Sequence, residues 1–232
     1  YDSALKYLQE SSDLINIEKR DIKMSDSRMP VYYNIGYIKE QMNDYDSALK
    51  YYQMSIFETQ KQDFNYKTNL TTLIKLYSGL GRIYSYEQKY KESDSIHLAA
   101  IDILENSKFM NKISRQLDLC AIYNSLGLSY ANRSDFLSAR EQFIKALNIL
   151  SDTTMFSSGS FYDGYVQTIC NISAACYDLR EIQEGSEYII KAIDMINDAP
   201  FGSIQEKTLY NLYQNTKVFA NKYASENNFE ML

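Results

Sequence analysis

The residue types that most often carry catalysis are few in this chain, and their spacing forms no reactive pair. Nucleophilic catalysis needs a base beside the nucleophile, and the 232 residues include one histidine, His97. His97 occupies a position that related segments fill with Tyr52, Phe143 and Ile189. Packing is therefore a better interpretation of His97 than a pH-sensing role, and we predict that the chain is not an enzyme.

The three cysteines do not form a metal or disulfide motif. Cys120, Cys170 and Cys176 are odd in number, widely spaced and without CxxC spacing, which argues against a zinc site or a disulfide framework. Cys170 and Cys176 are six residues apart, on different faces of a helix, and we interpret them as small packing residues. The SGLG at residues 78–81 lies inside a helical pattern and lacks the lysine of a phosphate loop. We expect no metal and no cofactor.

Paired carboxylates occur at predicted turns rather than in a catalytic arrangement. Asp44 pairs with Asp46, and Glu181 pairs with Glu184. Acidic residues at the first turn of a helix cap its free N–H groups and suit its dipole. We therefore predict that these carboxylates cap helices.

The composition favours a helical protein that does not bind nucleic acid. Gly 8 and Pro 2 are few for a sandwich or barrel, whereas Tyr 22 with Trp 0 suits a thin structure of two helical layers. The formal net charge of -6 argues against nucleic-acid binding. No apolar run reaches the roughly 18 to 20 residues that span a bilayer, so we expect a soluble segment without membrane contact. The compartment stays open between the cytoplasm and the bacterial periplasm.

One pattern recurs along almost the whole chain. Residues 1–7, YDSALKY, are identical to residues 45–51. In residues 123–146, Tyr123, Leu126 and Tyr130 form an apolar stripe at helical spacing, and a second helix follows the break after residue 134. A marker position, normally glycine, recurs every 45 to 47 residues at Gly36, Gly81, Gly127, Ser173 and Ala220. The chain is therefore a series of helical hairpins.

These hairpins resemble the tetratricopeptide repeat, with its aromatic, Leu-Gly and Tyr positions followed by Ala, Phe and Ala. The family period is about 34 residues, and the longer period here indicates longer helices with longer loops. The resemblance implies an all-α, right-handed superhelix of about ten antiparallel helices in one array over residues 1–232. The second helix of an interrupted repeat is expected at 1–24, full hairpins at 28–62, 68–107, 113–150 and 161–197, and a lone first helix at 204–232.

The resemblance also implies a binding surface, because first helices line the concave face of such arrays and their outward side chains bind a peptide or partner helix. A solvated face without a ligand is the alternative interpretation. The basic cluster that captures a carboxy terminus is represented only by Lys75 and Arg82. The residues expected to contact a ligand are Tyr33, Asn34, Tyr37, Lys75, Arg82, Tyr86, Asn124, Asn132, Gln167, Asn171 and Tyr177.

Three hypotheses for function follow. The first is a non-catalytic module that binds a protein or peptide on its concave face. The second is the sensory segment of a bacterial transcriptional regulator or sensor kinase, which repeats of this lengthened kind resemble. The third is a scaffold that forms a homo-oligomer through its ends, since open ends of a repeat array expose apolar surface.

Overall fold

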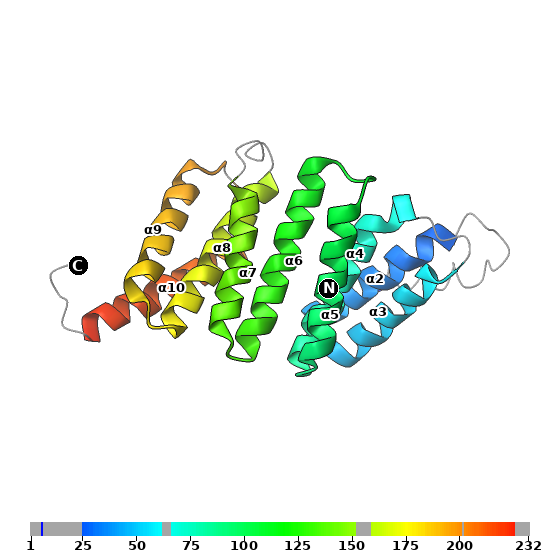
Figure 1. The fold of residues 1–232 in the computed structure, drawn as a ribbon, viewed down its shortest axis with the longest axis horizontal. Coiled ribbons are helices and arrows are strands. Elements are labelled where there is room, and N and C mark those ends of the chain that lie inside the picture. The colour runs from blue at the N-terminus through cyan, green and yellow to red at the C-terminus, as the bar shows by residue number, and fades with distance from the viewer. Residues whose placement is uncertain (1–5, 7–24, 62–65, 152–158, 201, 226–232) are drawn as a thin grey trace. The chain divides into compact units, whose positions relative to one another are not determined.

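The protein is all-α over the residues that the structure describes. The structure, a computed structural model, describes residues 6, 25–61, 66–151, 159–200 and 202–225. No strand occurs in these ranges (Figure 1), which confirms the predicted all-α class. The helix predicted at 1–24, apart from Lys6, and the end of the segment 204–232 lie outside them. The helices are α2 (Ser25–Gln41), α3 (Tyr45–Thr59), α4 (Tyr66–Tyr86), α5 (Tyr90–Asn106), α6 (Lys112–Asn132), α7 (Phe136–Leu150), α8 (Gly159–Asp178), α9 (Ile182–Asp198) and α10 (Glu206–Ser225).

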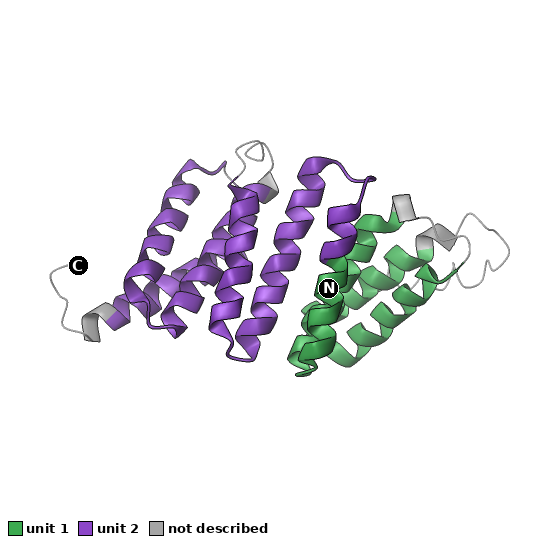
Figure 2. Cartoon of the chain, in the orientation of Figure 1, with its two compact units in different colours: residues 1–100 green, residues 101–232 purple. Residues whose placement is uncertain are grey.

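The helices belong to two compact units, unit 1 (Tyr1–Ala100) and unit 2 (Ile101–Leu232), divided within α5 (Figure 2). In unit 1, α2 packs against both α3 and α4, and α3 also packs against α4. In unit 2, α6 packs against α7, α8 packs against α9, and α7 and α10 both contact α8. Consecutive helices therefore pair as hairpins within each unit. The array bounds given above stay a prediction.

The turns inside four hairpins share one backbone conformation. In each turn, the residue two positions before the second helix begins has a positive φ. These residues are Asn43 (59°), Gln88 (60°), Ser134 (63°) and Arg180 (64°). The next N–H donates to a carbonyl five residues earlier, from Asp44 to Lys39 at 2.9 Å and from Glu181 to Cys176 at 2.8 Å. These bonds satisfy carbonyls that the end of a helix leaves open. The turn is thus a repeated structural unit, like the helices.

Capping explains some of the turn carboxylates and not others. The Asp44 carboxylate accepts a hydrogen bond from the Ser47 N–H at 3.2 Å, which lowers the pKa of Asp44, and Asp135 caps α7 in the same way. Glu181 makes no side-chain cap. Its carboxylate instead pairs with Arg140, so the capping prediction is wrong for Glu181.

The marker glycines make room for rings from the paired second helix. A Cβ on each glycine would lie 2.3 to 2.5 Å from a ring atom, in the pairs Gly36 with Tyr52, Gly81 with His97 and Gly127 with Phe143. The fourth hairpin replaces both partners, with Ser173 at the marker and Ile189 in place of the ring. At Ser173 the marker side chain instead donates a hydrogen bond to the Gly185 carbonyl of α9 at 3.0 Å. This pairing sets how closely the two helices of each hairpin approach.

Candidate peptide-docking surface

The residues expected to contact a ligand lie on the first helices of the hairpins, α2, α4, α6 and α8. Their access to solvent separates them into three groups. Asn34, Tyr37, Lys75, Tyr86 and Asn132 are exposed, Tyr33, Arg82, Gln167, Asn171 and Tyr177 are half-buried, and Asn124 is buried. Four of the five exposed residues come from unit 1. We call Asn34, Tyr37, Lys75 and Tyr86 the unit 1 surface.

Tyrosine rings dominate the unit 1 surface. Tyr37 is 42% and Tyr86 53% exposed. The Tyr33 ring stacks between Tyr37, at a centroid distance of 6.2 Å, and the buried Tyr52, at 5.9 Å. The Tyr86 ring lies 5.1 Å from that of Tyr45. Burial raises the pKa of Tyr33 to about 12, so its hydroxyl stays a hydrogen-bond donor at neutral pH.

A partly buried ionic network, with Glu40 buried and Arg82 half-buried, fixes the helices under these rings. Arg82 Nε of α4 lies 2.7 Å from Glu40 Oε1 of α2, and a second nitrogen of Arg82 lies 3.0 Å from Glu40 Oε2. The Tyr52 hydroxyl donates to the same carboxylate at 2.7 Å, and Arg82 also donates to Ser78. Burial opposes the charge on Arg82, but the hydrogen bonds to Glu40 hold the pKa of Arg82 above its ordinary value. A bidentate pair of this kind fixes geometry strongly, and it links α2, α3 and α4.

Side-chain amides join the first helices of unit 2. Asn124 Nδ2 of α6 donates to Thr168 Oγ1 of α8 at 2.7 Å, and Asn171 Nδ2 donates to Asn124 Oδ1 at 3.2 Å. Farther along, Asn215 Nδ2 of α10 donates to the Cys170 carbonyl at 2.7 Å. The structure therefore places Asn124 inside a contact between helices. Its amide sets the spacing of α6 and α8.

The remaining expected residues of unit 2 form a less aromatic surface. Asn132 is exposed at the end of α6, and Gln167 and Asn171 are half-buried on α8. The Tyr177 ring packs edge-on against Phe219 of α10, with centroids 5.6 Å apart. Tyr177 therefore contributes more to packing than Tyr37 or Tyr86 does.

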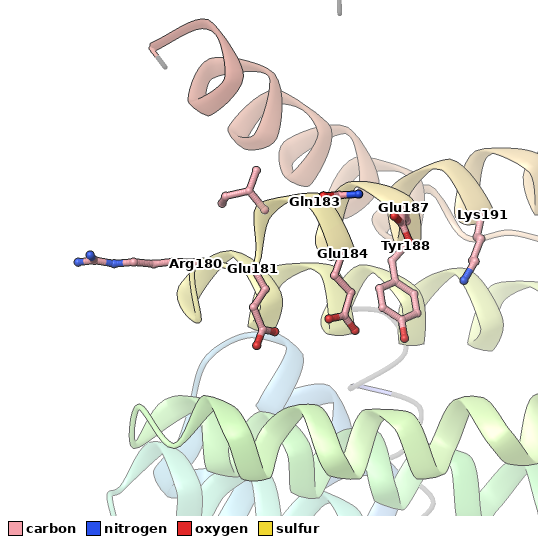
Figure 3. Close-up of a pocket in the computed structure, with 8 residues that line it drawn as sticks. Arg180, Glu181, Gln183, Glu184, Glu187, Tyr188 and Lys191 are labelled. Carbon is pink, nitrogen blue, oxygen red and sulfur yellow. The ribbon is translucent and has the colours of Figure 1, made fainter. Parts of the chain in front are cut away.

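One group of side chains has the composition of a metal site. The ligand atoms of Cys176, Glu181 and Glu184 lie within 4.8 Å of one another. Figure 3 shows Glu181 and Glu184 pointing toward the same side of α9. Arg140 of α7 pairs with Glu181 and lies 3.7 Å from Glu184, and burial raises the pKa of Cys176 to about 11. Because a guanidinium already balances the carboxylates and the thiol stays protonated, an internal ion pair is the better interpretation.

Sequence reasoning missed two shallow hollows, which lie at the same repeat register in the two units. The first is lined by Arg180, Glu181, Ile182, Gln183, Glu184, Glu187, Tyr188 and Lys191. The second is lined by Ile56, Tyr77, Lys91, Glu92, Ser95, Ile96 and Ala99. The α5 residues of the second hollow correspond by repeat position to residues 183, 184, 187, 188 and 191 of α9. Small or polar residues on the outward side of the second helices are the sequence signal that could have predicted these hollows.

The residues considered for chemistry are packed in the interior. His97 is fully buried, and burial lowers the pKa of His97 to about 4. Cys120, Cys170 and Cys176 are all buried free thiols. Gly79 and Gly81 lie within α4, where their missing side chains admit the rings of Tyr52 and His97. His97 therefore serves packing, as predicted, and the SGLG sequence lies inside a helix, as its pattern indicated.

Comparison with known proteins agrees with this architecture. A sequence profile of the tetratricopeptide repeat matches residues 30–56, and a comparison with curated proteins finds no match. The chain is similar in structure to BtubC (BKLC) from P. vanneervenii, with a TM-score of 0.68 and 13% identity over 96% of this chain and 87% of that chain. It is also similar to NprR in complex with its cognate peptide NprX, with a TM-score of 0.64 and 17% identity over 96% of this chain and 56% of that chain. At such identities, the likeness defines the fold.

The protein is therefore a tetratricopeptide-like helical-repeat protein, which confirms the resemblance and the fold class read from the sequence. All-helical repeat folds of this type are typically non-catalytic. Among the described residues, no helix combines the length and the apolar character needed to cross a membrane.

Proposed function

We propose that the protein binds an extended peptide or protein segment on its first helices, with the unit 1 surface as the main contact. The observation that carries this proposal is the pair of exposed tyrosines, Tyr37 on α2 and Tyr86 on α4. Their helices are held in place by the bidentate contact between Glu40 and Arg82. Rigid rings on a fixed support give contact area at low entropic cost.

The other residues of the unit 1 surface match the needs of a peptide backbone. Asn34 is exposed on α2 and offers both a donor and an acceptor. Its amide satisfies a backbone N–H or C=O that loses water on binding. Lys75 is exposed on α4 and adds a positive charge. We therefore propose a peptide with apolar or aromatic side chains and an acidic residue within reach of Lys75.

Two further features support this class of function. The fold is shared with NprR, whose structure contains its cognate peptide NprX. The amide and aromatic residues of unit 2, namely Asn132, Gln167, Asn171 and Tyr177, form a separate candidate contact region within that unit. The one histidine and the three cysteines are buried, so we propose binding without catalysis.

Selection from a library of displayed random peptides tests the proposal. We expect sequences selected on the wild-type chain to lose binding to the triple variant Asn34→Ala, Tyr37→Ala, Tyr86→Ala. They should keep it on the control Phe57→Ala, because Phe57 is 61% exposed but lies on the second helix α3. Selected peptides that bind the triple variant as tightly as the wild type would place the site elsewhere.

A second candidate is that these repeats form the sensory part of a bacterial regulator. The similarity to NprR favours it, and this chain spans 56% of NprR. In that role peptide binding would bias an attached output domain. We expect the gene to encode such a domain next to the repeats, and a gene that encodes the repeats alone would contradict this candidate.

A further inference from the structure

The exposed side of α4 carries a positive charge at one point and an aromatic ring at another. Lys75 is exposed, and Tyr86, the last residue of the helix, is 53% exposed. They are eleven residues apart, and eleven residues make almost three full turns, so both side chains lie on the same side of α4. A helix rises about 1.5 Å per residue, which places the two Cα atoms about 16 Å apart along the axis.

The charge of Lys75 is not balanced within the protein. Lys39 of α2 lies 3.2 Å from Asp44, and Arg82 of α4 pairs with Glu40. Lys75, in contrast, makes no ion pair with any residue that the structure describes. Its ammonium group is therefore available to an anionic group of a ligand.

Between these two ends, the same side of α4 carries short side chains and a guanidinium group. Ser78 is buried, and Gly79 has no side chain. Arg82 Nε and one N–H of Arg82 Nη2 donate to the Glu40 carboxylate, and one N–H of Nη1 donates to Ser78. A guanidinium group has five N–H donors, and the other two donate to no acceptor in the part of the chain that the structure describes. The middle of this side can therefore donate to a carbonyl oxygen.

The aromatic end of this side is held in place by a second ring. The Tyr86 ring lies 5.1 Å from the Tyr45 ring at the start of α3, and the two planes are tilted by 30°. A ring that is fixed before binding loses little entropy when it contacts a ligand. Tyr86 is therefore suited to receive an aromatic or large aliphatic side chain, while Lys75 is suited to receive a carboxylate.

We propose that the unit 1 surface selects an extended segment in which an acidic residue and an aromatic or large aliphatic residue are four to six positions apart. An extended chain rises about 3.3 Å per residue, so about five residues span the distance from Lys75 to Tyr86. The flexible lysine side chain accounts for one position more or less. The spacing is the same for either direction of the segment. This inference rests on the proposed docking surface and adds the spacing that a ligand needs.

Selection from displayed peptides with one fixed phenylalanine and random residues on both sides tests the spacing. On the wild-type chain we expect Asp and Glu to be enriched four to six positions from the phenylalanine. On Lys75→Glu the same positions should favour Lys and Arg, because the charge on the protein is reversed. The matched control is Lys50→Glu, since Lys50 is also exposed but lies on the second helix α3. This control should give the wild-type preference.

Calorimetry with one selected peptide, and with the same peptide carrying an amide in place of its acidic side chain, measures the contact with Lys75. The amide peptide should bind the wild type about 2- to 5-fold more weakly, as the loss of an exposed ion pair predicts. Lys75→Gln should bind the two peptides equally. The difference on the wild type should shrink at about 0.5 M salt, because salt screens exposed charges. A purely structural role of Lys75 would instead weaken both peptides alike.

The triple variant Asn34→Ala, Tyr37→Ala, Tyr86→Ala separates this inference from the function on which it rests. Selected peptides that lose binding to the triple variant but show no acidic enrichment at this spacing would overturn the spacing and leave the docking surface in place. The same holds if the acidic preference persists on Lys75→Glu. Selected peptides that bind the triple variant as tightly as the wild type would overturn both proposals.

Discussion

His97 shows how one residue links packing with protonation. A Cβ on Gly81 would lie 2.3 Å from the ring of His97. This ring fills the position that the Phe143 ring fills in unit 2. Its Nδ1 is 3.5 Å from Ser93 Oγ, and its buried Nε2 has no hydrogen-bond partner. A proton on this ring would be buried with the positive Arg82 as a nearby charge. The neutral form is therefore the one compatible with the fold.

We predict an acid-dependent loss of stability that His97→Phe removes. Burial lowers the pKa of His97 from 6.5 to about 4. The contribution of neutral His97 to the free energy of unfolding is therefore complete above pH 6.5. It is lost as the pH falls toward 4, and the loss is about 3 kcal/mol at most. Urea unfolding at pH 7 and pH 4.5 measures it, and the variant should lose about 2 to 3 kcal/mol less than the wild type between these values. Equal losses in both proteins would show that His97 does not titrate in this range.

Gly127 and Gly164 differ in the space around them, and we predict that alanine has opposite effects on stability at the two positions. A Cβ on Gly127 would lie 2.4 Å from the buried ring of Phe143, whereas one on Gly164 of α8 would meet nothing within 4 Å. Gly127→Ala should therefore destabilise the chain by about 1 to 3 kcal/mol through overpacking. Gly164→Ala should stabilise it by about 0.5 to 1 kcal/mol, because alanine favours a helix interior. Thermal melts of both variants check the prediction, and a stable Gly127→Ala variant would contradict the close approach of α6 and α7.

At the scale of elements, the repeated turn explains how one hairpin leads into its second helix. A left-handed residue ends each first helix, and the following N–H closes the turn. Asparagine tolerates this conformation well, whereas glutamine and arginine do so at a cost. Asn43 is therefore better suited to its turn than Gln88 or Arg180.

We predict that Gln88→Gly stabilises the chain. Gln88 has a φ of 60°, and relief of the left-handed penalty, less the entropy that glycine loses on folding, gives about 0.5 to 1 kcal/mol. Asn43→Gly is the comparison and should change stability by a few tenths of a kcal/mol at most. Chemical denaturation of both variants measures the change in the free energy of unfolding. A destabilised Gln88→Gly variant would mean that the glutamine side chain supports the turn.

The sequence determined the elements far better than the contacts between them. Gly36, Gly81 and Gly127 with their aromatic partners predict hairpins because both residues recur at fixed spacing. The Glu40–Arg82 pair was not predicted. Its two residues belong to adjacent repeats and stand at different positions within them, so the repeat pattern does not bring them together. Asn124 was expected at the surface from its place near a family asparagine, but the structure buries it against Thr168. Ser125, at the family position itself, is buried as well, so the contact with the next first helix, and not the register, decides the exposure.

At the scale of the molecule, the two units offer different surfaces on the same kind of framework. Unit 1 presents exposed tyrosines above the partly buried Glu40–Arg82 ion pair, whereas the first helices of unit 2 are joined by amides. Repeat proteins derive their stability from contacts between neighbours, so both linkages hold first helices at fixed spacing. A peptide that binds unit 1 thus meets a surface that is formed before binding.

The unit 1 surface is the site that we propose for the ligand. The most direct measurement is isothermal calorimetry with one library-selected peptide against the wild type, Tyr37→Ala, Tyr86→Ala and the control Phe57→Ala. We predict that each tyrosine substitution raises Kd by about 10-fold or more and that Phe57→Ala leaves it within about two-fold. Tyrosine variants that bind as tightly as the wild type, or a loss of binding confined to Phe57→Ala, would contradict docking on the first helices.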